Sequence, residues 1–147
     1  RGVPNFVFGS IYVQAGRGSP VGVLLRRNLD STSDKLKVVK DPESPDTADV
    51  ICQIVSEQAQ RVIVGSNVAG QVREIELRLI VKFSLRTPGG DEVIEPTEIR
   101  QIRNVTYNET NALSKTVEEE MLNKDMRNDI VQQIIRRLAA VKSLQVS

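Results

Sequence analysis

The chain has no histidine, no tryptophan and a single cysteine among its 147 residues. Without histidine there is no Ser-His or Cys-His nucleophile pair, no imidazole general base and no histidine-bearing zinc site. One cysteine cannot form an internal disulfide or a cysteine-rich metal cluster. These absences exclude the commonest catalytic and metal chemistries, and they predict a domain that has no metal or cofactor and is not an enzyme.

Aromatic residues and excess charge are also scarce. Aromatic residues make up 3% of the chain, so the core is predicted to be mainly aliphatic. The 20 basic and 19 acidic residues leave a net charge of +1, without the basic excess typical of nucleic-acid binding, and we expect no nucleic-acid partner. No apolar run approaches the ~20 residues that cross a bilayer. The chain opens on Arg1 without an initiator methionine, which indicates that an upstream segment has been removed.

The length suits one domain over residues 1–147. Its first half predicts a strand over 6–13 and a helix that begins at Pro20, with Ser19 as its N-cap, and ends near Asn28 or Ser33. The sequence leaves open a brief strand over 36–39. A polar, proline-broken loop covers 40–47, and an extended run over 50–64 is interrupted by polar residues 57–60.

The clearest strand covers residues 75–85, where apolar and polar residues alternate with a period of two. One face of this strand is predicted to be buried and the other to meet water or something polar. After a turn at 87–91, a further strand covers 93–107, in which Pro96 favours an edge position or a bulge because it cannot donate to a strand ladder.

From about Asn111 the apolar residues step by four, which predicts a long amphipathic helix. Its N-cap is either Asn111 or, in a capping box with Glu119, Thr116. Within the helix, Glu120 and Lys124 are spaced as an ion pair. The element order β-α-β-β-β-α predicts an α+β two-layer sandwich, with two helices on one face of a four-stranded, mostly antiparallel sheet.

Several familiar motifs are better explained by structure than by chemistry. The pair Gly16-x-Gly18 before a helix is the weakest form of phosphate cradle, because Pro20 removes one N–H donor. Acidic residues 118–120 suit the first turn of a helix. Cys52 lies in an apolar run without a basic neighbour, which predicts a buried thiol and not a nucleophile.

Basic side chains on the later strands permit two interpretations. They are a solvated face balanced by Glu74 and Glu76, or a diffuse surface that binds phosphates or anionic lipid headgroups. Composition alone favours the solvated face. The basic residues concerned are Arg73, Arg78, Lys82 and Arg86 in and beside the strand over 75–85, Arg100 and Arg103 in the strand over 93–107, and Lys115 before the long helix.

Three segments resemble the LPS-assembly lipoprotein LptE family. They are the run from Gly70 to Leu79 with the strand after it, Ala112-Leu113-Ser114-Lys115 leading into 119–122, and the tail 129–138. The opening Arg1-Gly2 is similar to the end of the family's Cys-Gly-Phe-x-Leu-Arg-Gly start, whose cysteine is acylated. The resemblance covers nearly the whole chain.

The resemblance implies a Gram-negative outer-membrane lipoprotein on the periplasmic side, anchored by a lipid on a cysteine upstream of Arg1. Its kin plug the β-barrel LPS translocon protein LptD, help it assemble and bind lipopolysaccharide. Lys115 matches the family's basic position before the C-terminal helix. A second basic position falls on an uncharged residue near Val68 or Ala69, where Arg73 or Arg61 are the candidate substitutes. The resulting candidate lipopolysaccharide contacts are Lys115, Arg73, Arg78, Lys82 and Arg103.

Two other classes of function are carried as alternatives. One is a different periplasmic lipoprotein chaperone or pilotin, which would bind a secretion barrel and not lipopolysaccharide. The other is an enzyme that uses carboxylates alone, which requires two acids converging in a cleft. The acidic residues of this chain fall instead on predicted helix surfaces and strand faces.

Overall fold

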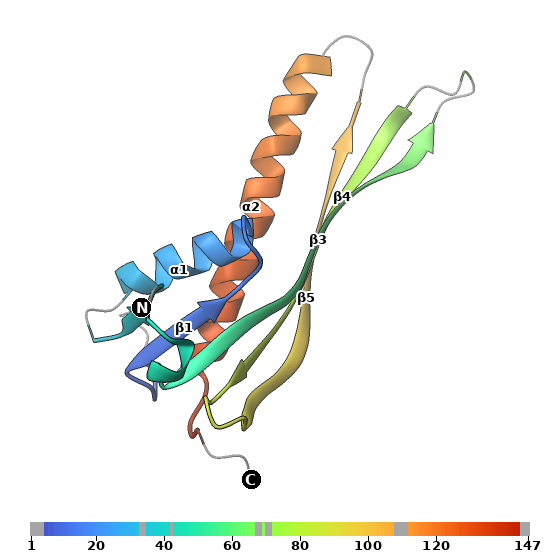
Figure 1. The fold of residues 1–147 in the computed structure, drawn as a ribbon. Coiled ribbons are helices and arrows are strands. Elements are labelled where there is room, and N and C mark those ends of the chain that lie inside the picture. The colour runs from blue at the N-terminus through green and yellow to red at the C-terminus, as the bar shows by residue number, and fades with distance from the viewer. Residues whose placement is uncertain are drawn as a thin grey trace.

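A long sheet forms one layer of the molecule, and two helices lie on one of its faces (Figure 1). The computed structural model describes residues 5–32, 35–41, 43–66, 69, 72–107 and 112–144, and the backbone alone for 72, 73, 112 and 113. The elements are β1 (Ser10–Gln14), α1 (Pro20–Thr32), β2 (Lys37–Val39), the short 3-10 helix η1 (Pro45–Thr47), β3 (Val50–Ser66), β4 (Val72–Arg86), β5 (Glu92–Thr106) and α2 (Ala112–Ala139).

The sheet has five strands in the order β2-β1-β3-β4-β5, which corrects the prediction of a four-stranded sheet. The extra strand is β2, which pairs in parallel with β1 through Ile11 and Val38. β1 is also parallel to β3, whereas β3, β4 and β5 are antiparallel, so the sheet is mixed. The parallel part exists because α1 returns the chain to the starting end of β1, as a helical crossover does.

The core lies between the helices and one face of the sheet. On β4 the alternating apolar residues are all buried, as the period of two predicts, and Phe83 is fully enclosed. The four-residue steps of α2 are buried against them. The members of these two sets are Ile75, Leu77, Leu79, Val81, Phe83 and Leu85 on β4, and Met126, Ile130, Ile134 and Leu138 on α2. The predictions of a one-sided sheet and an aliphatic core are confirmed.

The ends of several elements differ from the predicted ones. The first strand begins at Ser10 and not at residue 6; Phe6 and Phe8 precede it, with their ring centroids 5.3 Å apart. α2 is already helical at Ala112, so the capping box at Thr116 is wrong, and Asn111 lies outside the described residues. β5 occupies an edge of the sheet, as Pro96 predicted.

β3 continues as one strand through the polar residues 57–60, which the sequence had indicated as an interruption. A register shift between Ile54 and Ser56 marks a bulge, after which Glu57 turns to the helix side of the sheet. There its carboxylate accepts hydrogen bonds from Ser19 Oγ (2.6 Å) and from the backbone N–H of Val21 (3.2 Å). The polar stretch is therefore retained in the strand because it meets the start of α1.

Candidate functional site

The basic residues predicted to contact an anion do not form one site. On β4, Arg78 and Lys82 alternate with the buried residues and so lie on the open face of the sheet, away from the helices. Arg103 of β5 is in register with buried Leu77 and lies on the helix side, where Nη2 donates to Asp129 Oδ2 of α2 at 2.9 Å. The side chain of Arg73 lies outside the described residues.

The open face is a mixed surface. Arg78 donates from Nε to Glu76 Oε1 at 2.7 Å, and Arg100 of β5 pairs with Glu98 at 3.0 Å. Lys82 forms no ion pair with any side chain that the structure describes, although Glu98 is its register partner. Ile80 stands between Arg78 and Lys82, so the charge on this face is neither continuous nor of one sign.

Lys115 lies in the first turns of α2, where its Nζ donates to Glu118 Oε1 at 3.0 Å. The Lys115 side chain is 21% exposed, so it is partly buried. An ammonium group carries three donors. The pair with Glu118 uses one of them.

A second cluster anchors α2 just beyond Lys115. Arg61 of β3 donates to both carboxylate oxygens of Glu119, at 2.9 and 3.3 Å, and to the Tyr107 hydroxyl at 3.3 Å. The Tyr107 hydroxyl donates in turn to Glu119. The hydrogen bond from Arg61, with that from Tyr107, holds the pKa of Glu119 below its ordinary value although burial opposes the shift. The cluster ties the far ends of β3 and β5 to the helix that carries Lys115.

The sequence did not indicate this cluster, because its members are separated by 46, 58 and 12 positions. Arg61 is one of the two candidate substitutes for the missing basic position. In the structure its guanidinium is occupied by Glu119 and Tyr107. The alternation of residues along β3 could have placed Arg61 on the helix side of the sheet, since Arg61 shares a face with Glu57 and Ala59.

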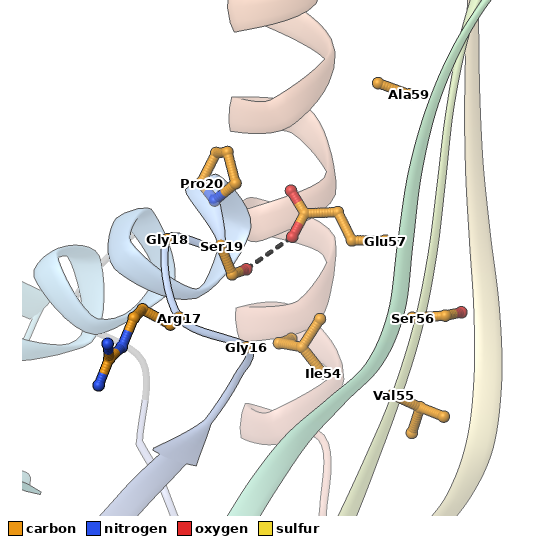
Figure 2. A pocket seen from close by; sticks show the side chains of 10 residues that line it. All are labelled: Gly16, Arg17, Gly18, Ser19, Pro20, Ile54, Val55, Ser56, Glu57 and Ala59. Atoms are coloured by element: carbon orange, nitrogen blue, oxygen red, sulfur yellow. Dashed lines mark hydrogen bonds between the residues drawn. The ribbon is translucent and has the colours of Figure 1, made fainter.

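A pocket of about 450 Å³ lies between the loop before α1 and β3. Figure 2 shows Glu57 pointing from β3 toward Ser19 at the start of α1, whereas Ser56 points away. The start of α1 thus already holds a carboxylate of this chain, and Ser19 Oγ accepts from the N–H of Gly22 at 2.9 Å. The arrangement supports the turn interpretation of Gly16-x-Gly18 over a phosphate cradle.

Three further observations concern the cysteine thiol, metal binding and membrane-spanning helices. Cys52 is fully buried, and burial raises the pKa of its thiol to about 12, as expected for an unreactive core residue. The described residues contain no group of three or more acidic, histidine or cysteine side chains able to hold a metal ion. Across the same part of the chain, none of the helices combines the length and apolarity needed to cross a membrane.

Comparisons with known proteins agree with this fold. The family model "LptE: Lipopolysaccharide-assembly" matches residues 8–138. The LPS-assembly lipoprotein LptE of Yersinia enterocolitica is 30% identical over 109 residues, covering 74% of this chain and 51% of that protein. The protein of the same name in Yersinia pestis is 33% identical over 91 residues, covering 62% of this chain and 42% of its own length. The chain thus spans about half the length of the curated relatives it matches.

Solved structures of bacterial lipoproteins share this fold. An uncharacterized lipoprotein B from Nitrosomonas europaea, solved by NMR, superposes with a TM-score of 0.81 at 34% identity, covering 95% of this chain and 87% of that one. The rare lipoprotein B from Shewanella oneidensis shares the fold, with a TM-score of 0.72 at 22% identity, covering 89% of this chain and 94% of that one. Because the family model spans most of the sequence, from the residues before β1 almost to the end of α2, this chain belongs to the LptE lipopolysaccharide-assembly family.

Proposed function

We propose that this chain is the folded body of an outer-membrane lipoprotein that binds lipopolysaccharide and serves its transport to the cell surface. The family match over residues 8–138 carries the proposal. In this proposal the protein faces the periplasm and is held at the membrane by a lipid on a cysteine upstream of Arg1. Its work is binding and assembly, with no bond broken, which suits a chain without histidine.

The protein partner in this proposal is the β-barrel LptD, which the domain plugs and helps to assemble. The open face of the sheet supports a polar partner, because Arg78, Glu76, Arg100 and Glu98 present paired charges of both signs there. The interior of a membrane β-barrel is polar. A face of balanced charges can contact such a wall without leaving a large unpaired charge.

Lys115 is the residue that we propose to contact a lipopolysaccharide phosphate. It is half-buried at the start of α2, and the Arg61–Tyr107–Glu119 cluster fixes that end of the helix against the sheet. Glu118 competes with the phosphate for the ammonium group. The structure spreads Arg78, Lys82 and Arg103 over both faces of the sheet, so these residues, together with Arg73, are separate candidates and not part of one cluster with Lys115.

The lipopolysaccharide contact is tested by charge variants at the start of α2. Lys115→Gln and Lys115→Asp should weaken capture of lipopolysaccharide by the purified protein, whereas Glu118→Gln should strengthen it because it frees the ammonium. Lys142→Asp, at an exposed position beyond α2, is the matched control. Circular dichroism and thermal unfolding check that each variant keeps its fold. Unchanged capture in both Lys115 variants would show that Lys115 is not a headgroup contact.

The barrel partner is tested separately by purifying the tagged protein from outer membranes and identifying the barrel that accompanies it. We expect LptD. A secretion barrel in its place would support the alternative of a pilotin. Because this experiment does not depend on Lys115, it separates failure of the lipid contact from failure of the assignment to lipopolysaccharide transport.

A further inference from the structure

A groove between the two helices has features of a second ligand site. Its volume is about 320 Å³, in the range of small-molecule sites. Its lining comes from α1 and from the middle of α2, the two helices that lie on the sheet in Figure 1. The residues that line it are Pro20, Val23, Leu24 and Arg27 of α1 and Lys124, Arg127 and Asn128 of α2.

The charge in this groove is of one sign. Arg27, Lys124 and Arg127 line it, and no carboxylate does. None of the three cations forms an ion pair or a side-chain hydrogen bond within the part of the chain that the structure describes. The pair between Glu120 and Lys124 that the sequence predicted is therefore not formed.

Two of the nearby acidic residues are paired with other cations, whereas Glu120 and Asp125 form no ion pair among the described residues and do not line the groove. Asp129 of α2 accepts from Arg103 at 2.9 Å, and Asp30 of α1 accepts from Lys40 at 3.1 Å. Here the structure leaves three cations facing one cavity, so a bound anion would supply the missing countercharge.

The groove also has an apolar component that extends beyond it. Pro20, Val23 and Leu24 supply the apolar lining, and Val23 is 44% exposed. On α2, Met121 and Val117 precede Lys124 by three and seven positions, so they lie on the same stripe of the helix. Their exposed fractions are 64% and 50%. A ligand with its anion in the groove could lay an apolar chain along this stripe.

We propose that the groove binds an amphiphile whose head is a phosphate monoester and whose acyl chain lies along Met121 and Val117. Three converging cations favour a group with more than one negative charge, and a phosphate monoester carries about −1.5 to −2 near neutral pH. A phosphodiester or a single carboxylate carries only one. An acidic protein segment explains the cations less well, because it would need two carboxylates within one small cavity and leaves the apolar stripe without a role.

This site is separate from the contact proposed at Lys115. Lys124 lies nine residues further along α2, which places it about 14 Å away along the helix axis. The proposal does not depend on the function in lipopolysaccharide transport, since it rests on the groove and its charges. The groove can be tested with Lys115 intact.

The test uses short-chain phosphatidic acid below its micelle concentration and the ¹⁵N-labelled chain. Amide shifts should change at the groove residues of both helices. The affinity for this monoester should exceed that for inorganic phosphate, and for phosphatidylglycerol of the same chain length, by about tenfold or more. The triple variant Arg27→Gln/Lys124→Gln/Arg127→Gln should lose this binding by at least tenfold. Met121→Ser should weaken binding of the lipid and leave that of inorganic phosphate unchanged.

The matched control is Arg136→Gln/Arg137→Gln/Lys142→Gln, which removes the same charge at exposed positions near and beyond the end of α2. It should retain binding to within about twofold. Equal losses in the two triple variants would show general charge attraction and overturn the proposal. Equal affinity for the monoester and the diester would overturn the choice of headgroup, and tighter binding of a polyglutamate peptide than of the lipid would point to an acidic protein segment instead.

Discussion

Gly22, in the first turns of α1, offers a test in which helix propensity and packing predict opposite results. Propensity favours alanine over glycine inside a helix by ~1 kcal/mol. However, a Cβ atom at Gly22 would lie 2.5 Å from Cβ of Ala15 and 3.2 Å from Ser19 Oγ. We therefore expect Gly22→Ala to destabilise the protein.

The size of this loss of stability depends on which atoms around the new methyl group can move. Carbon atoms pack at ~3.5–4 Å, and overpacking of this kind costs ~1–3 kcal/mol. Cβ of Ala15 is fixed to the backbone and cannot rotate away. Ser19 Oγ caps the helix through the N–H of Gly22, and loss of such a cap costs ~1 kcal/mol. After the gain in propensity, we expect the free energy of unfolding to fall by about 1–3 kcal/mol.

A double-mutant cycle in urea, followed by far-ultraviolet circular dichroism, separates the two effects. Ala15→Gly removes the atom that obstructs the new methyl group. In that background Gly22→Ala should be neutral or stabilising, which gives a coupling energy of roughly 2 kcal/mol between the two positions. If Gly22→Ala stabilises the protein in both backgrounds, the close packing of the loop on α1 is not what requires glycine.

Three further predictions concern the core and the cluster at α2. Because burial raises the pKa of Cys52 to about 12, a thiol reagent at pH 8 should modify the native protein only at the rate of unfolding, and the denatured chain at once. Since the pKa of Glu119 is lowered in the folded state, its contribution to stability is present above the unfolded pKa and lost as pH falls through the folded pKa. Denaturation at pH 7 and pH 3 should show a smaller loss of stability in Glu119→Gln than in the parent. Met126→Ala should cost ~2–5 kcal/mol by creating a cavity, whereas Met121→Ala, 64% exposed in the parent, should change stability by less than ~0.5 kcal/mol in the same urea titration. Similar costs for the two methionine variants would contradict the assigned burial.

The sequence predicted the elements whose pattern is long and regular. Alternation over 75–85 gave β4 and its buried face, and four-residue steps gave α2, because each pattern repeats often enough to exclude the other period. The sequence does not decide β2, because three residues cannot establish a period. Its partner β1 also shows that parallel pairing depends on where α1 directs the chain, which no local pattern encodes.

The candidate site was less predictable than the fold. Lys115 could be selected because it matches the basic position of the LptE family, but its pair with Glu118 and the cluster beyond it depend on side-chain geometry. Arg61 and Glu119 are 58 positions apart, and the spacing of charges along the chain carries no information about such a pair. Conversely, Glu120 and Lys124 have the right spacing for a pair that the structure does not contain.

The mixed sheet also sets an order of events during folding. β3, β4 and β5 follow one another in the chain and pair as neighbours, so their contacts form with short loops to close. β1 must wait for β3, which begins at Val50 after α1, β2 and η1 have been synthesised, and closing that longer segment costs more entropy. We expect the three antiparallel strands to associate early and the parallel edge to dock late. A slowed molecule would then leave open the edge of β3 that pairs with β1 and the core face that α1 covers, and an unpaired strand edge of this kind is where another chain could add.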